Sequence, residues 1–252
     1  MIIDGHGHIG TYSKFYPLKI RTVEQTIDAM DAAGVEKMVV SHLESFSYDA
    51  PEGNKRLKED IARYPGRFIP FFNVHPRYER QAADEIAEYA GGLGWRGLKL
   101  HPQYQMYSAN CIEVKRLIER AAKYNCAVLY HSGDSFVGAW CSPAMIADVA
   151  KDFPRTTVIM GHMGVSDWPG AIEEAREHKN IILDATSCII NYGVLEYAVK
   201  QIGRERVIWG SDFPFYPHQL GLSKIIDSEL DAASKEFVLG RNIERIMKHA
   251  DN

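Results

Sequence analysis

The chain lacks the features that direct proteins to nucleic acids or membranes. Its 29 basic and 33 acidic residues leave a formal net charge of -4, and no run of Lys or Arg forms a basic stripe. No apolar run is long enough to cross a bilayer, and no basic segment followed by an apolar core begins the chain. We therefore expect a small-molecule partner, no nucleic-acid or membrane contact and a cytoplasmic location, with a homodimer left open as the assembly.

Cysteine is also scarce. The four cysteines are widely scattered and form no Cys-x-x-Cys pair; they are Cys111, Cys126, Cys141 and Cys188. Neither a disulfide framework nor a thiolate zinc site is indicated, so we expect reduced thiols. The sequence has no linker and no low-complexity segment, and 46% of its 252 residues are hydrophobic. This composition is typical of a globular protein, and we expect one domain over residues 1–252.

Short apolar runs alternate with amphipathic segments along the whole chain. Residues 22–33 illustrate the second kind, with a helical apolar spacing, Thr22 as N-cap and Gly34 after the end. Strands are expected within 1–10 and at 35–43, 67–74, 94–101, 126–131, 156–162, 180–184 and 206–212. Eight such units predict an α/β fold, a single (β/α)8 TIM barrel closed by a C-terminal helix over 234–248. An open doubly wound sheet is disfavoured because no Gly-x-Gly-x-x-Gly turn follows an early strand.

The first expected strand ends in metal-binding residue types. Side chains alternate faces along a strand, so Asp4, His6 and His8 share one face while Gly5 and Gly7 leave the other bare. Two imidazoles on one face can converge on one metal ion, and neutral imidazole is a common zinc ligand. A lone His-x-His pair also arises by accident of composition. Whether later strands end in the same way decides between these interpretations.

Four later strands do end in polar side chains. The apolar runs of the fourth, fifth, sixth and eighth strands are followed by His101, His131, His162 and Asp212, in that order. The active site of such a barrel lies at the C-terminal ends of its strands. Ten histidines placed at random in 252 residues would rarely gather there. The sequence therefore predicts a catalytic centre at this end of the barrel.

These residues carry a family resemblance. His-x-His on the first strand, His131, His162 and Gly-Ser-Asp at 210–212 resemble the amidohydrolase superfamily. One branch of this superfamily contains aminocarboxymuconate-semialdehyde and resorcylate-type decarboxylases and related metal-dependent hydrolases. Four segments of the chain resemble that branch: Gly-Leu-Lys-Leu-His-Pro, Gly-His-Met-Gly, Trp-Gly-Ser-Asp-Phe-Pro and Val-Leu-Gly-Arg-Asn. Segment 10–21 is shorter than the long first loop of those decarboxylases, and their substrate-carboxylate arginine has no match.

The resemblance implies one divalent metal and a set of site residues. It implies as ligands His6, His8, His131 and Asp212, with His162 nearby as acid or base. Three imidazoles and one carboxylate leave a position for water, whose pKa zinc lowers to about 7. Asp212, both ligand and base, would pass the proton to the leaving group. We expect zinc first, with manganese and iron as alternatives.

The sequence therefore predicts an enzyme, a hydrolase that acts on a small, anionic amide, lactone or ester through one metal-activated water. The first alternative is a non-oxidative decarboxylase of a small aromatic or enoic acid, in which Lys99 and the metal hold the carboxylate. A second alternative, a non-catalytic metal-binding barrel, is disfavoured because a binding protein needs no open metal position beside a base.

Residues on the rim complete the expected site. Lys99 and His101 would face the substrate, although Lys99 alternatively takes the place of the carboxylated lysine that bridges two metals in binuclear branches of the superfamily. Tyr12 and Trp140 lie on rim loops and are expected to wall the substrate, with Tyr107 and Phe213 as further candidates. His42 and His75 also end strands; they are either loop anchors or pocket residues.

Overall fold

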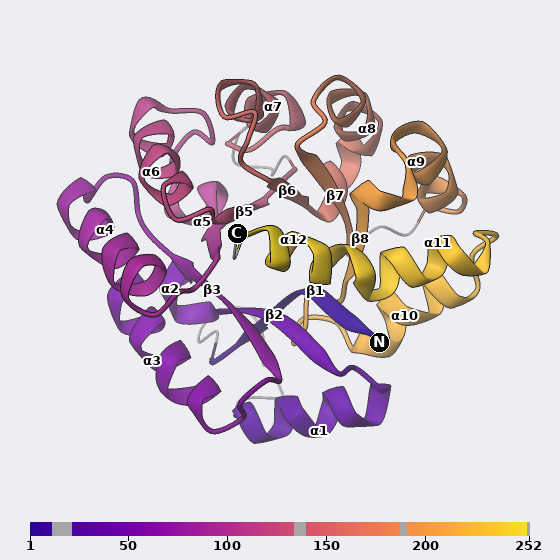
Figure 1. The fold of residues 1–252 in the computed structure, drawn as a ribbon, viewed down its shortest axis with the longest axis horizontal. Coiled ribbons are helices and arrows are strands. Elements are labelled where there is room, and N and C mark those ends of the chain that lie inside the picture. The colour runs from indigo at the N-terminus through magenta and orange to yellow at the C-terminus, as the bar shows by residue number, and fades with distance from the viewer. Residues whose placement is uncertain (12–21, 134–139, 187–190, 251–252) are drawn as a thin grey trace.

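Eight parallel strands follow one another around a barrel in chain order (Figure 1). The structure is a computed structural model, and it describes residues 1–11, 22–133, 140–186 and 191–250. The strands are β1 (Ile3–Ile9), β2 (Lys37–His42), β3 (Phe68–Asn73), β4 (Gly97–Leu100), β5 (Ala127–His131), β6 (Val158–Gly161), β7 (Ile181–Thr186) and β8 (Val207–Gly210). The sheet closes where a parallel bridge joins Gly7 of β1 to Phe213 after β8. The predicted (β/α)8 barrel is confirmed.

Helices surround the strands and cover the outside of the barrel (Figure 1). They are α1 (Val23–Ala33), α2 (Leu43–Ser47), α3 (Ala50–Ala62), α4 (Glu79–Ile86), α5 (Pro102–Gln105), α6 (Ile112–Ala122), α7 (Pro143–Asp152), α8 (Trp168–Glu177), α9 (Val194–Ile202), α10 (His218–Ile226), α11 (Ala232–Glu236) and α12 (Asn242–Ala250). Short π-helical segments cover Ala87–Gly92 and Phe237–Arg241, and short 3-10 segments cover His162–Asp167 and Arg204–Arg206. No helix among the described residues is long and apolar enough to span a bilayer.

Local sequence signals set the helix ends. The Thr22 side chain accepts the backbone N–H of Gln25, and the Gln25 side chain accepts the N–H of Thr22, each at 3.3 Å. Gly34 ends α1 in the left-handed conformation, with φ of 71°, which glycine adopts at little cost. The sequence predicts a strand over 35–43, but β2 ends at His42 because its ring accepts the N–H of Glu44 at 3.2 Å and starts α2.

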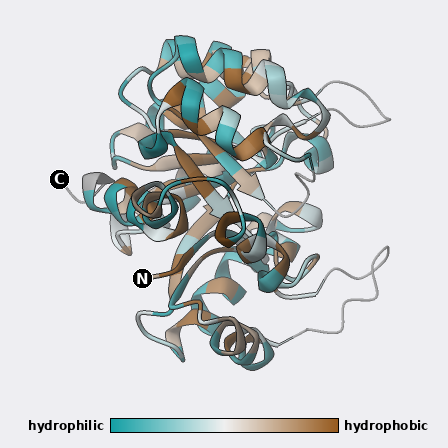
Figure 2. Cartoon of the chain, turned by 90° about the vertical axis from the view of Figure 1, so that its right-hand side faces the viewer, coloured by the Kyte–Doolittle hydropathy of each residue, from teal (hydrophilic) through white to brown (hydrophobic). Residues whose placement is uncertain are grey.

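The inside of the barrel is divided into an apolar half and a polar half. One apolar cluster joins inward side chains of the strands to α12, among them Ile3, Phe71, Ile208, Ile243 and Ile246. Figure 1 shows α12 lying across this end of the barrel, as predicted for a closing helix. Figure 2 shows the hydrophobic strands enclosed by helices whose outer faces are hydrophilic. The inward polar side chains are left at the opposite, C-terminal end.

Candidate active site

The structure brings together the predicted ligands of β1 and β8. His6 and His8 are buried, and the side chain of Asp212 is mostly buried. The Asp212 Oδ1 atom lies 3.3 Å from Nε2 of His8 and 4.0 Å from Nε2 of His6. The backbone N–H of Asp212 donates to the carbonyl of His6 at 2.8 Å. Closure of the barrel therefore places these three side chains beside one another.

His162 lies inside this cluster. Three side chains, those of His6, His162 and Asp212, each offer one ligand atom, and these atoms lie within 4.8 Å of one another. These three residues could therefore hold a metal ion. His162 and Asp212 both have φ of 60°, in the left-handed region that non-glycine residues seldom adopt. Such backbone conformations gather at functional sites, where the surrounding structure holds them. The predicted role of His162, acid or base beside the metal, stays a prediction.

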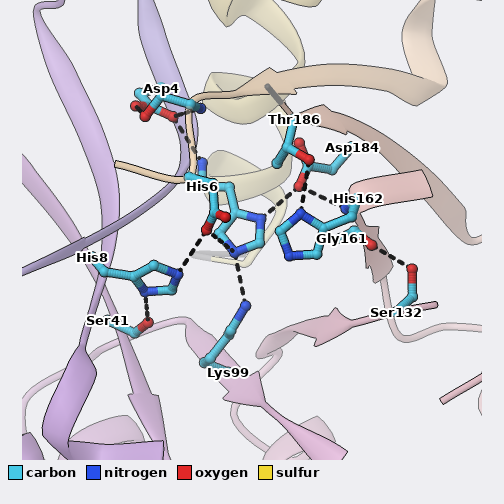
Figure 3. A network of polar contacts seen from close by, with 12 residues as sticks. Asp4, His6, His8, Ser41, Lys99, Ser132, Gly161, His162, Asp184 and Thr186 are labelled. Atoms are coloured by element: carbon cyan, nitrogen blue, oxygen red, sulfur yellow. Dashed lines mark hydrogen bonds and ion pairs between the residues drawn. The ribbon is translucent and has the colours of Figure 1, made fainter. Parts of the chain in front are cut away.

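Each clustered imidazole is held from behind by an outer partner (Figure 3). The Nδ1 contacts are His6 to Asp184 Oδ2 at 2.6 Å, His8 to Ser41 Oγ at 2.9 Å, and His162 to Thr186 Oγ1 at 2.8 Å. In all three rings this leaves Nε2 for the interior of the site. Histidines that bind metals almost always use their second ring nitrogen in this way, because the outer bond fixes tautomer and orientation.

His131 is placed differently from the other histidines. Its ring centre is 4.7 Å from that of His162, and it stacks on His101 at 4.1 Å. Its Nε2 atom lies 2.9 Å from Oε1 of Gln103 and is engaged there. His131 would have to release this amide to bind a metal through Nε2. Its predicted role as a ligand stays a prediction.

Lys99 is the cation of the site. Its side chain is fully buried, and Nζ lies 2.8 Å from Nε2 of His6. Burial lowers the pKa of Lys99 to about 8, against the opposing effect of the Asp212 and Asp184 charges. Burial lowers the pKa of His6 well below its usual value and that of His131 to about 3. The imidazoles are therefore neutral at neutral pH, the form that binds metals.

A cavity of about 260 Å³ opens onto the cluster. It is lined by His8, Phe46, Lys99, His101, Tyr104, His131, His162, Asp212, Phe215 and Tyr216. Lys99 and His101 line this cavity, and their predicted role in facing the substrate stays a prediction. Trp140 lines a separate cavity of about 720 Å³ above α2 and α3, which shares only Phe46 and Tyr104 with the first. Tyr12 lies outside the described residues.

The other rim histidines make loop contacts, and His75 also lines the cavity of about 720 Å³. His42 caps α2, and Nε2 of His75 contacts the carbonyl of Gln105 at 3.1 Å. Phe213 is buried and stacks on His218 with ring centres 4.5 Å apart, and Tyr107 is also buried. None of these residues lines the cavity at the cluster.

Asp4 forms a buried junction that sequence reasoning missed. Its Oδ1 atom accepts the N–H of His6 at 3.0 Å and that of Ser211 at 2.9 Å. Its Oδ2 atom accepts the Ser211 hydroxyl and lies 3.0 Å from Nδ1 of His218. The carboxylate therefore ties β1 to the end of β8 and to α10. An acidic residue on the same strand face as His6 and His8 was the signal that could have revealed it.

Replacement of Asp4 by alanine is expected to destabilise the fold. A buried polar group left without its partner costs roughly 1–3 kcal/mol. This substitution leaves polar groups of both Ser211 and His218 without their hydrogen-bond partner. We expect the free energy of unfolding, measured by urea titration, to fall by at least about 2 kcal/mol. Asp31→Ala is the control, since the exposed Asp31–Arg67 pair contributes about 0–1 kcal/mol. Equal, small losses in both variants would contradict a structural role for Asp4.

Comparisons with known proteins show the family and support the fold. A family model described as Amidohydrolase matches residues 3–248. A 2,6-dihydroxybenzoate decarboxylase from Rhizobium is 17% identical, with 100% of this chain and 99% of that chain covered and a TM-score of 0.80. A dihydroxybenzoic acid decarboxylase from a Polaromonas species, with manganese and the inhibitor 2-nitroresorcinol, is 16% identical, with 98% and 96% covered and a TM-score of 0.80. A TIM-barrel protein of uncharacterised function from Bordetella bronchiseptica is 18% identical, with 100% and 99% covered and a TM-score of 0.81.

Proposed function

The chain belongs to the amidohydrolase family, and we propose that within it the protein is a metal-dependent decarboxylase of a small hydroxylated aromatic acid. The sequence alone favours hydrolysis first and decarboxylation second. Two similar solved structures are decarboxylases of dihydroxybenzoic acids, and one of them holds manganese. These likenesses support decarboxylation over hydrolysis, and among the metals expected from the sequence they favour manganese over zinc.

The observation that carries the proposal is the cavity over the histidine cluster. Its volume of about 260 Å³ is below the range of about 300–1,000 Å³ of pockets that take drug-sized ligands, so it fits a molecule of about one ring. Aromatic side chains wall it, and Phe46 stacks on His101 with ring centres 5.0 Å apart. The Lys99 ammonium lines the same space and would attract a carboxylate. A flat, anionic, single-ring acid suits this lining.

The donor set fits a divalent metal. Neutral imidazoles from His6 and His8 and the carboxylate of Asp212 converge, and mixed nitrogen and oxygen sites suit zinc, iron and manganese. His162 and His131 are close enough to complete the set or to act beside it. When bound, such an ion supplies a Lewis acid that attracts the oxygens of the substrate.

The residues of the chain would then have separate roles in substrate binding and proton transfer. Lys99 and the aromatic walls hold the acid with its carboxylate toward the cluster. A proton taken up from water is passed by Asp212 or His162, the two cavity residues placed to carry it, to the ring carbon that bears the carboxylate. A hydroxyl beside the carboxylate makes this carbon electron-rich and eases the protonation. The bond between the ring carbon and the carboxyl carbon then breaks, carbon dioxide leaves, and the electron pair of that bond restores the aromatic ring.

A paired substrate screen tests the proposal. Protein loaded with manganese would be given hydroxybenzoates and enoic acids in one arm, and lactones and amides in the other. We expect carbon dioxide from the hydroxybenzoate arm and no acid release from the lactones and amides. Hydrolysis without carbon dioxide would restore the hydrolase as the better account. A bound metal with no turnover in either arm would favour the non-catalytic barrel.

Replacement of Lys99 by methionine should separate substrate binding from metal binding. Methionine keeps the apolar length but removes the charge, so KM for the acid should rise by roughly tenfold or more, equivalent to 1.4 kcal/mol. Metal affinity should be kept or increased, because the ammonium now occupies Nε2 of His6. Lys115→Met, at a surface lysine paired with Asp148 and Asp152, is the control. A loss of metal on Lys99→Met would instead indicate a bridging, carboxylated lysine.

A further inference from the structure

Asp184 on β7 is buried directly behind the metal-binding cluster. Its Oδ2 atom lies 2.6 Å from Nδ1 of His6 and 3.4 Å from the backbone N of His162. It thus connects β7 with β1 and β6 (Figure 3). On the basis of the proposed metal site, we propose that Asp184 is a positioning residue that fixes the tautomer of His6 and so makes Nε2 the ligand atom.

The neighbours on both sides of the ring require the same tautomer. The Lys99 ammonium has only donors, so Nε2 of His6 must accept its hydrogen bond at 2.8 Å. A neutral imidazole carries one ring proton, which is then on Nδ1 and is donated to the Asp184 carboxylate. The reverse arrangement, with a protonated Asp184 donating to Nδ1, would put an Nε2–H group against the ammonium. Two donors would then face each other.

Close packing keeps the imidazole and the carboxylate in place. A Cβ atom on Gly210 would lie 2.5 Å from Cβ of His6 and 2.9 Å from Oδ1 of Asp184. A Cβ atom on Gly161 would lie 3.1 Å from Cε1 of His6. Both distances at Gly210 are shorter than real Cβ contacts, so only glycine leaves room there. His6 therefore has little space to turn away from Asp184.

The second oxygen of Asp184 indicates that stability alone does not explain the residue. Within the described part of the chain, Oδ1 is buried and has no hydrogen-bond partner. A half-satisfied buried carboxylate is costly to keep. Its benefit is the strong, charge-assisted bond that orients a ligand histidine.

Thr186, two residues further along β7, provides a matched contrast. Its hydroxyl contacts Nδ1 of His162 at 2.8 Å and can either donate or accept. Thr186 therefore supports the His162 ring without dictating its tautomer. Among the three outer partners Asp184, Ser41 and Thr186, Asp184 is the carboxylate, which accepts a hydrogen bond and does not donate one.

Asp184→Asn tests the proposal, because the amide keeps the shape but can donate to Nδ1 and shift the ring proton to Nε2. We expect manganese affinity, measured by chelator competition, to fall by roughly 10–100-fold, as for other outer-shell changes at metal sites. Asp31→Asn, the same change at an exposed carboxylate paired with Arg67, should bind manganese as the wild type does. Nitrogen-15 spectra of the metal-free wild type should show His6 protonated at Nδ1, with the signal assigned through its loss in His6→Gln.

Wild-type manganese affinity in Asp184→Asn would overturn the proposal, and so would an Nε2–H tautomer of His6 in the wild type. If Asp184→Asn does not fold, the wild-type spectrum alone decides. Neither readout depends on turnover. A protein that binds manganese but decarboxylates nothing would therefore refute the proposed function and leave the role of Asp184 to be decided by these measurements.

Discussion

Replacement of His6 by alanine is expected to remove the metal and, with it, turnover. The wild type, purified without chelator, should hold about one divalent ion per chain, as a mononuclear site of this donor type does. His6 contributes a buried imidazole whose Nε2 lies near Asp212 and whose Nδ1 is anchored by Asp184. Loss of a ligand should weaken binding by more than the roughly 10–100-fold typical of an outer-shell partner. Elemental analysis of both proteins measures the change.

His178→Ala is the control for this experiment, because His178 is partly exposed and lies between α8 and the start of β7, at the end of the barrel opposite the cluster. Full metal content in His6→Ala would remove the site from the account. His131→Ala should also lose metal if His131 exchanges Gln103 for the ion. Two ions per wild-type chain, with added mass on Lys99, would indicate the binuclear arrangement instead.

Replacement of His162 by asparagine is expected to lower kcat by roughly 10²–10⁴-fold, the loss typical of a general acid or base. Metal content should remain, since His6, His8 and Asp212 are unchanged. The side chain of His162 borders the cavity at a polar end of the barrel, so the free energy of unfolding should change little. Steady-state kinetics, metal analysis and urea titration on one preparation measure all three effects.

The position of His162 makes this experiment discriminating. Its ligand atom is within 4.8 Å of those of His6 and Asp212, close enough for a direct bond to the same ion. Loss of metal in His162→Asn would show that His162 is a metal ligand. His131 could then contact the substrate instead of the metal. Near-normal turnover would make it a bystander and leave Asp212 as the proton donor.

The fold could be predicted because each strand carries its own signal. Apolar runs such as Met160 and its neighbours alternate with capped amphipathic segments, and the count of eight then requires closure. The helices α2 and α5 escaped prediction because four or five residues are too few for a helical pattern. Both start where a histidine ring, His42 or His101, accepts a backbone N–H from the following turn.

The site could be predicted only in part. The strand-end rule located His6, His8, His162 and Asp212, because backbone topology alone decides which strand ends meet. The outer partners depend on side-chain directions across the barrel, and Asp184 is 178 positions away from His6. Its one local signal is an acidic residue within a buried aliphatic strand. The orientation of His131 toward Gln103 has no such signal.

The central claim is that this cluster removes a carboxyl group from an aromatic acid. Its most direct test gives carboxyl-labelled hydroxybenzoates, 2,6-dihydroxybenzoate among them, to the manganese-loaded protein in deuterium oxide, with His6→Ala alongside. The account predicts labelled carbon dioxide and a phenolic product with one deuterium at the vacated ring carbon, both absent from His6→Ala. Intact acids across the panel, or the same carbon dioxide from His6→Ala, would contradict it.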